Sequence, residues 1–186
     1  MNKISRIFGV IALALCLTTV LSFNVFAAET DDAVEGEVIE IRTWKDLKDL
    51  DARVEGGDML EGVTVKLMND IDLYEMGEGD EPVTFNPIGA NKAYFKGTFD
   101  GQGHTIKGVY VNSTWERIGL FATSAADAVI KDFTLENSYI CNTSSSASAI
   151  GSIVGRLGGK LEAVKSSAQV VVSGSQYAGG LVGDVH

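Results

Sequence analysis

Gly180-Leu181-Val182-Gly183 repeats a four-residue pattern that occurs twice earlier in the chain. The earlier copies are Ser152-Ile153-Val154-Gly155 and Gly119-Leu120-Phe121-Ala122, and each copy reads small, large aliphatic, β-branched or aromatic, small. The copies begin at positions 119, 152 and 180, so the two intervals between them are similar in length. Recurrence at intervals of about 20 to 50 residues is typical of stacked repeat architectures, in which each unit packs on the next.

A second apolar pattern recurs between the copies of the first. Ile106-x-x-Val109-x-Val111 matches Ile130-x-x-Phe133-x-Leu135, and Leu161-x-x-Val164 follows with Ser166 in the last position. Apolar residues two apart suit one face of a β-strand, and the residues before them suit a corner in the chain. Two patterns that recur in the same order favour a true repeat.

A parallel β-helix satisfies both patterns. Each coil of such a fold carries two or three short strands and buries its apolar face only against the neighbouring coils. Equivalent residues stack from coil to coil, so we expect Leu120, Ile153 and Leu181 to form one buried ladder. After Gly57 the chain is β-branched and punctuated by glycine, and we expect no helix there. The predicted fold is all-β, a parallel β-helix (solenoid) with one N-terminal capping α-helix.

Residues 38–74 precede the repeats and are expected to form the N-terminal cap, as strand, helix and strand. Thr43 and Asp46 have the spacing of a capping box, which predicts a helix over 43–56 with apolar residues on one face. From Val63 to Leu73 apolar and polar residues alternate, as they do in a half-buried strand. We expect the helix to cover the first coil.

Residues 1–27 read as a secretory signal peptide. Lys3 and Arg6 give a positive start, an apolar stretch follows, and a small-residue cleavage site ends at Ala27. The alternative is a membrane anchor, for which the apolar stretch is short. We therefore expect a secreted or cell-surface protein with no membrane span after cleavage, and an acidic linker over 28–37.

The charge of the chain is strongly negative, at −10. An acidic chain does not bind nucleic acid or anionic membrane surfaces by charge, so both partners are excluded by that route. Removal of the leader takes Cys16 with it and leaves only Cys141, so we expect no internal disulfide and a fold held by its core.

Residues 75–186 are expected to carry the repeats, in an array that is cut short at its C-terminal end. The chain stops just past the strand pattern at 180–183, and no second helix follows to cover that coil. An uncovered strand edge pairs readily with other chains, so we expect self-association through the C-terminal edge.

The residues quoted so far resemble the GLUG-motif repeat family of bacterial secreted and surface proteins. Phe85-Asn86-Pro87-Ile88-Gly89 and the segment 97–106 are similar to the first coil of those domains, and the three four-residue copies resemble the repeat itself. The resemblance covers about residues 60 to 186. It implies a right-handed β-helix, as found in adhesins and in the non-catalytic parts of IgA-specific metallopeptidases, and it implies no activity.

Candidate residues for nucleophilic or metal chemistry are few. His104 is the only internal histidine, no H-E-x-x-H zinc motif occurs, and nothing in the sequence places Cys141 beside His104. We expect His104 to be a turn residue whose ring hydrogen-bonds between coils. Gly101-Gln102-Gly103 is not a nucleotide-binding fingerprint, because no G-x-G-x-x-G is completed and no helix follows.

Carboxylates are the remaining candidates for catalysis. Asp70, Asp72 and Asp100 could pair as in glycosidases, or hold calcium as in β-helical polysaccharide lyases, with Arg117 or Lys131 as the base. Aspartates in turns more often bond their own backbone, and that is the role we expect. The acidic loop from Glu75 to Glu81 offers oxygen ligands for calcium, but its spacing fits no EF-hand, so we expect a solvated loop.

Aromatic rings on the flank of a solenoid can stack on sugars, although they also serve as packing residues. The candidates are Trp44, Tyr74, Tyr94, Tyr110, Trp115 and Tyr139. Tyr110 lies between two inward-facing valines and should point outward, and Trp115 precedes the charged pair Glu116-Arg117. Tyr110 and Trp115 are therefore the residues that we expect to make surface contacts.

The sequence thus predicts a non-catalytic extracellular scaffold or adhesion module of a bacterial surface protein. Its expected partner is a glycan or protein of a host or cell surface, and no catalytic, cofactor-binding or metal-binding residues are expected. The alternative is the N-terminal part of a secreted enzyme, lyase-like or a peptidase, whose catalytic portion is absent. A truncated reading frame without independent function is a third interpretation.

Overall fold

The computed structural model describes residues 36–77, 82–91 and 93–186. The expected signal peptide, most of the acidic linker and most of the acidic loop lie outside these residues. Strands dominate the described part of the chain, accompanied there by one α-helix, α1 (Trp44–Glu55), and one short 3₁₀ helix, η1 (Leu73–Met76). The fold is therefore largely β. The expectation of no helix after Gly57 is wrong at η1, where the Asp72 carboxylate accepts a hydrogen bond from the Tyr74 N–H (3.0 Å).

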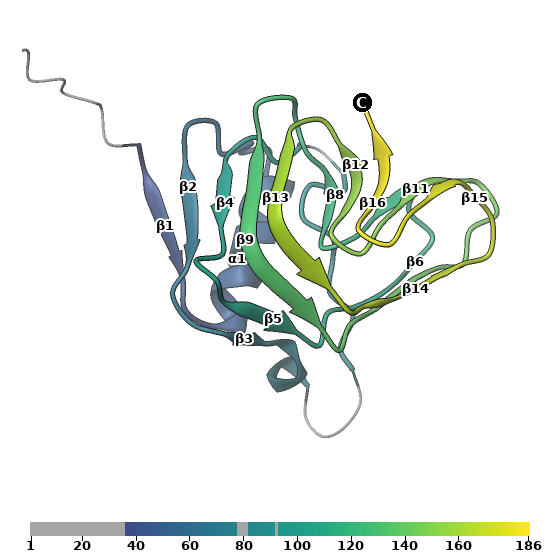
Figure 1. Ribbon diagram of the computed structural model, residues 1–186, viewed down its shortest axis with the longest axis horizontal. Coiled ribbons are helices and arrows are strands. Elements are labelled where there is room, and N and C mark those ends of the chain that lie inside the picture. The colour runs from purple at the N-terminus through teal and green to yellow at the C-terminus, as the bar shows by residue number, and fades with distance from the viewer. Residues whose placement is uncertain (1–35, 78–81, 92) are drawn as a thin grey trace, which may run out of the picture. The chain divides into compact units, whose positions relative to one another are not determined.

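A large sheet runs through the described part of the chain, and every pair of neighbouring strands in it is parallel (Figure 1). One path through it follows the order β1-β2-β4-β9-β13; β5 also pairs with β9, and β3 pairs with β5. Its strands are β1 (Val38–Ile41), β2 (Thr64–Leu67), β3 (Ile71–Asp72), β4 (Thr98–Asp100), β5 (Thr105–Lys107), β9 (Val129–Glu136) and β13 (Lys160–Ser166).

Three smaller sheets, also parallel, contain the remaining strands. The first holds β6 (Tyr110–Ser113), β10 (Tyr139–Asn142) and β14 (Gln169–Val172); the second β7 (Arg117–Ile118), β11 (Ala147–Ile150) and β15 (Ser175–Ala178); the third β8 (Phe121–Thr123), β12 (Val154–Leu157) and β16 (Val182–Val185). The chain visits the large sheet and then these three in the same order each time. We call each such run a pass, and the passes cover 98–123, 129–157 and 160–185.

The register of the third small sheet confirms the pattern of the four-residue copies. Phe121 pairs with Val154, and Val154 pairs with Val182, which are the offsets read from the sequence. Ile153 is fully buried, as expected, and so is the equivalent Leu120. Leu181 departs from the expectation, because 38 % of its surface is exposed. It immediately precedes β16, the last strand of its sheet in the described chain, so no further layer covers it.

The second sequence pattern is confirmed for only one of its two steps. Leu161 pairs with Ile130, as predicted, but Ile106 pairs with Leu135 and not with Ile130. The cause is the eight-residue strand β9, which runs without a break alongside both β4 and β5 of the preceding pass. The sequence match between Ile106 and Ile130 therefore joined two positions that are not equivalent.

A sharp corner separates β4 from β5 and accounts for the shift. The corner contains four residues where β9 has two, since Asp100 pairs with Lys131 and Thr105 with Thr134. A side chain at Gly101 would overlap Phe133 on the next pass, so this position requires glycine. The two residues after Gly101, Gln102 and Gly103, have positive φ, which is typical of a tight turn.

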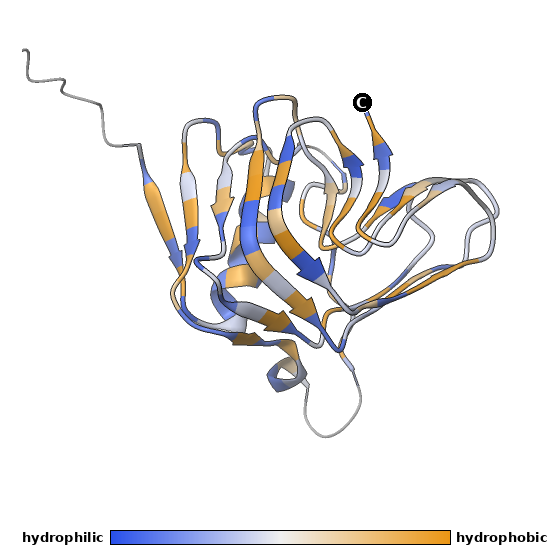
Figure 2. Cartoon of the chain, in the orientation of Figure 1, coloured by the Kyte–Doolittle hydropathy of each residue, from blue (hydrophilic) through white to orange (hydrophobic). Residues whose placement is uncertain are grey.

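The interior is apolar and contains a cluster of phenylalanine rings from the first two passes and the segment before them. Phe99 lies edge-on to Phe121 (5.2 Å between ring centres) and to Phe133 (5.4 Å), and Phe95 lies against Phe121 (5.1 Å). Figure 2 shows hydrophobic and hydrophilic residues alternating along β9 and β13, as expected for strands with one buried face. Stacking like residues on like residues fills this interior.

Helix α1 begins and is oriented as the sequence predicts. The Asp46 carboxylate accepts a hydrogen bond from the Thr43 N–H (2.8 Å), and the Thr43 hydroxyl accepts one from the Asp46 N–H (3.4 Å). The helix buries Leu47 and two further apolar residues of the predicted face. Its C-terminal residue Glu55 accepts hydrogen bonds from the backbone of Ala90 and Asn91, which ties the helix to the segment before β4.

An unexpected acid lies on the buried face of α1. Asp51 is 6 % exposed, and its Oδ1 atom has no hydrogen-bond partner among the described residues. Burial raises the pKa of the Asp51 carboxyl to about 7, and the negative charge of Glu55 acts in the same direction. The folded protein therefore holds this proton more tightly than the unfolded chain does.

Stability should fall with rising pH because of Asp51. The stabilisation by the neutral carboxyl is complete below its ordinary pKa of 3.8 and is lost as the pH rises through about 7. Asp51→Asn should stabilise the protein at pH 8 by about 2–4 kcal/mol, with little effect near pH 4. Urea unfolding at both pH values measures this, with the exposed Asp49→Asn as control. An unchanged pH dependence in Asp51→Asn would contradict the burial argument.

Truncation of the stacked ladder tests the register. Ile153→Ala should lower the free energy of unfolding by about 2–5 kcal/mol, because the residue is fully buried between passes. Leu181→Ala, at the equivalent position of the last pass, should lower it by about 1 kcal/mol or less, because Leu181 is partly exposed. Denaturant unfolding of both variants gives the comparison. Equal losses would show that the last pass is covered as completely as the one before it.

Candidate functional site

Tyr110, one of the two expected contact residues, lies beside other tyrosines. Its ring on β6 stacks on Tyr139 of β10, with 5.6 Å between ring centres and 14° between planes. Tyr74 lines the same groove, and its hydroxyl donates to the Asn137 carbonyl (2.8 Å). The groove has a volume of about 220 Å³. A ladder of partly exposed rings therefore follows the flank of the stack.

Trp115, the other expected contact residue, lines a different hollow and is partly buried against the core. Its carbonyl accepts a hydrogen bond from the Asn142 side chain (2.7 Å), and its N–H donates to the Ser113 hydroxyl (3.0 Å). The structure therefore places Tyr110 and Trp115 at separate positions on the surface, and Trp115 also has a packing role.

The three aspartates considered as catalytic acids each contact a different basic side chain. Asp72 pairs with Lys107 (2.8 Å), and Asp100 pairs with Lys131 of the next pass (3.2 Å). Asp70 contacts the His104 ring (3.1 Å), as expected of a turn histidine that bonds between passes. The N–H of the residue after His104 lowers the pKa of Asp70 most, and His104 lowers it further. These contacts are structural, and they do not converge on one point.

Cys141 is buried on β10, whereas His104 lies at the corner before β5, and the two are not in contact. In the described parts of the chain, no three His, Cys, Asp or Glu residues gather closely enough to hold a metal ion.

Among the described helices, none has the length and apolar character required to cross a bilayer.

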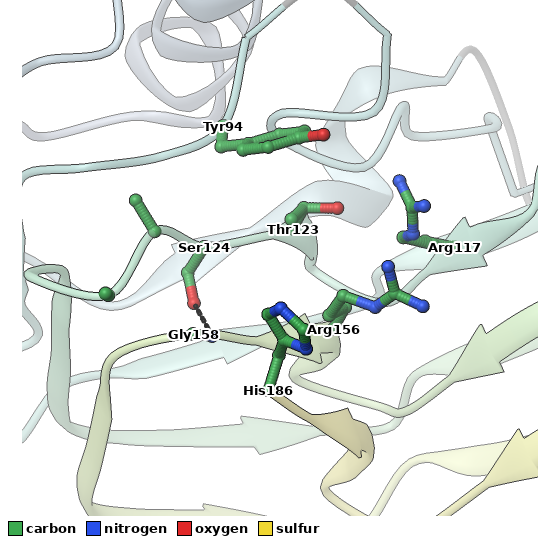
Figure 3. A pocket seen from close by; sticks show the side chains of 9 residues that line it. Tyr94, Arg117, Thr123, Ser124, Arg156, Gly158 and His186 are labelled. Atoms are coloured by element: carbon green, nitrogen blue, oxygen red, sulfur yellow. Dashed lines mark hydrogen bonds between the residues drawn. The ribbon is translucent and has the colours of Figure 1, made fainter.

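A basic hollow emerges as the strongest candidate site. Its volume is about 360 Å³. We call it the arginine hollow, and it is lined by Tyr94, Arg117, Thr123, Ser124, Ala125, Ala126, Arg156, Gly158 and His186 (Figure 3). These residues come from separate passes, so stacking alone brings them together.

Strand pairing positions the floor of the arginine hollow. Thr123 at the end of β8 pairs directly with Arg156 of β12. Just beyond them the Gly158 N–H donates to the Ser124 carbonyl (3.1 Å), and a side chain at Gly158 would lie only 2.7 Å from that oxygen. The close approach of these two backbone segments fixes the relative positions of the side chains above them.

The two arginines are partly buried and incompletely neutralised. The Arg156 Nε lies 3.0 Å from a carboxylate oxygen of Asp184, its neighbour on β16, and no other described residue engages its remaining nitrogens. The only ion pair of Arg117 in the described chain is a long one of 3.7 Å, to the exposed Glu116. The Arg117 Nε is buried and has no hydrogen-bond partner among the described residues. The hollow is therefore a local centre of positive charge.

Other polar groups face the same end of the arginine hollow. In Figure 3 the Tyr94 hydroxyl and the Thr123 hydroxyl both point toward the guanidinium groups of Arg117 and Arg156. The Tyr94 ring is 48 % exposed and forms one wall. A hollow with cationic donors, hydroxyl groups and an aromatic face can bind a small anion that carries a polar ring.

The sequence pointed to two residues of this hollow, Arg117 as a possible catalytic base and Tyr94 as a possible sugar-stacking ring, but not to the hollow itself. A signal for Arg156 was present in the repeat: Arg156 and Asp184 both follow two residues after the paired valines, Val154 and Val182. Aligning the copies would have placed this cation and this anion opposite each other. Tyr94 precedes the repeats, and no pattern in the sequence indicated its position.

Comparisons with known proteins find two relatives and no assigned family. No protein-family model matches the chain, and no solved structure matches it. Over 110 residues the chain is 33 % identical to halomucin of Haloquadratum walsbyi, a match that covers 59 % of this chain and 1 % of halomucin. Over 105 residues it is 31 % identical to a protein of Evansella cellulosilytica named as a Gly-rich membrane protein, covering 56 % of this chain and 12 % of that protein. The chain thus spans a small part of either relative, and the resemblance to GLUG repeats stays a prediction.

Proposed function

We propose that residues 38–186 form a right-handed parallel β-helix module that serves as a non-catalytic extracellular scaffold or adhesion element. The observation that carries the proposal is the repeated order of the four parallel sheets. Each pass contributes strands to each sheet, and equivalent strands of successive passes pair in parallel. Such a stack presents a long flank for contacts without needing a catalytic cleft.

The position of α1 supports a capping role in this proposal. The helix packs on β1 and η1 and hydrogen-bonds to residues 90 and 91, all of which precede the first complete pass. An apolar helix face there shields the first layer of the core from water, because Leu47, Leu50 and Val54 are buried. A β-helix requires such a cover at an end that no strand protects.

The proposed location is the cell surface or the extracellular space. The signal-peptide pattern at 1–27 supports export. One relative is named as a Gly-rich membrane protein, and the name of the other, halomucin, agrees with an extracellular role. The function of a large surface protein built from such modules would be contact with a glycan or protein outside the cell.

Adhesion through the tyrosine ladder can be tested directly. The chain purified after export should bind surfaces coated with purified envelope polysaccharide, and Tyr110→Ala should weaken binding about tenfold by removing a stacking face. Tyr177→Ala, an exposed tyrosine on β15 outside this groove, is the matched control. Binding that is insensitive to Tyr110 would reject this residue as a contact, and retention of the chain inside the cell would reject the proposed location.

The outer edge of the stack offers a further test, of self-association. Strands β13, β14, β15 and β16 each have a strand neighbour on one side only in the described chain. Leu181 and Val185 on this last pass are exposed, Val185 by 71 %. Backbone groups at such an edge pair readily with other strands.

We expect the exported chain to form concentration-dependent oligomers by sedimentation, with hydrogen exchange in Val182–Val185 slowing as oligomers form. Val185→Lys should abolish both effects, because a charge on an edge strand opposes pairing. Met59→Lys, also at an exposed apolar position but away from this edge, should leave both unchanged. A chain that stays monomeric at high concentration would contradict self-association through β13–β16.

A further inference from the structure

The arginine hollow concentrates positive charge in a chain whose net charge is −10. Arg117 and Arg156 are both about three-quarters buried, at 26 % and 29 % side-chain exposure, and each has one carboxylate neighbour: Asp184 lies 3.0 Å from Arg156, and the exposed Glu116 lies 3.7 Å from Arg117. These two contacts leave most of the guanidinium N–H groups without an acceptor among the described residues. Charged donors left over in a partly buried hollow favour an anionic ligand.

The donors that remain available fit a carboxylate. Asp184 engages Nε of Arg156, so the two terminal nitrogens of that guanidinium are left to bind another acceptor. On Arg117 one terminal nitrogen has the long contact to Glu116, and the other terminal nitrogen has no acceptor among the described residues. A planar guanidinium presents paired N–H groups whose spacing matches the two oxygens of a carboxylate.

The rest of the hollow fits a sugar ring better than an extended chain. The half-exposed face of Tyr94 can stack on the C–H groups of a pyranose, and Thr123 presents a hydroxyl beside it. Ala125 and Ala126 supply a short apolar wall. The volume of about 360 Å³ is at the lower end of the range for small-ligand sites.

We infer that the arginine hollow binds the carboxylate-bearing sugar unit of an acidic polysaccharide, with the carboxylate between Arg117 and Arg156 and the ring on Tyr94. This inference rests on the proposed function for one point, that the hollow meets polysaccharides outside the cell. It gives the proposed adhesion module a ligand class and a specific contact, distinct from the tyrosine ladder.

The test is a calorimetric titration of the exported full chain with oligomers of galacturonic acid. We expect saturable binding that weakens as salt concentration rises, and no binding of the corresponding neutral galactose oligomers. Arg117→Gln should weaken binding about tenfold or more, because a charge-assisted donor pair is lost. The affinity of Arg117→Lys should lie between those of the wild type and Arg117→Gln, because lysine keeps the charge but lacks the paired N–H groups of a guanidinium. Tyr94→Leu should weaken binding without changing its salt dependence.

Arg42→Gln is the matched control, because Arg42 is an exposed arginine paired with Glu40 outside the hollow. Tyr94→Leu replaces a half-exposed side chain, so it should fold even if Arg117→Gln does not. The inference is overturned by equal binding of neutral oligomers, by tighter binding of sulfated sugars or of an oligo-aspartate peptide, or by unaltered affinity in folded Arg117→Gln. If the exported, folded chain binds no uronate, the inferred ligand is wrong, whereas the proposal of a β-helix scaffold or adhesion module is unaffected.

Discussion

Parallel backbone pairing between successive passes is the constraint on which the rest of the structure depends. Phe121, Val154 and Val182 stand at equivalent positions of three strands, and the backbone of each pass bonds to the next. Side chains along a strand alternate between its two faces, so a slip of one residue in β9 would turn the buried Ile130 toward solvent. Length differences between passes are therefore confined to corners, and the strands keep one register.

The sequence predicts those features that depend on short-range signals. The Thr43–Asp46 capping box and the start of α1 could be read directly, because both depend on residues a few positions apart. The four-residue copies give the register of β8, β12 and β16, because small residues flank an apolar pair in each. The second pattern fails at Ile106 because an apolar period does not reveal a corner of extra length before the next strand.

The arginine hollow was beyond reach of motif reasoning for a different reason. Its side chains come from the segment before the first complete pass and from successive passes, with Tyr94, Arg117 and Arg156 far apart in sequence. A motif search examines neighbours along the chain, whereas this site is assembled by neighbours across the stack. Likewise, the burial of Asp51 follows from packing of α1 and not from helical periodicity, which gives an acid no reason to face inward.

The one-sided edge formed by β13–β16 has a mechanical consequence. Tension applied to the chain at residue 186 would act first on β16 and would reach β15, β14 and β13 only in turn, because the chain runs through the sheets one after another. Hydrogen bonds would then break a few at a time, and the chain would absorb mechanical work gradually as it extends. The hollow is lined by Arg117 and Arg156 from different passes, so a bound ligand would hold these two passes together against the applied force. A stack of this kind would therefore extend in small steps under tension, and an occupied hollow would resist the steps that separate its two layers.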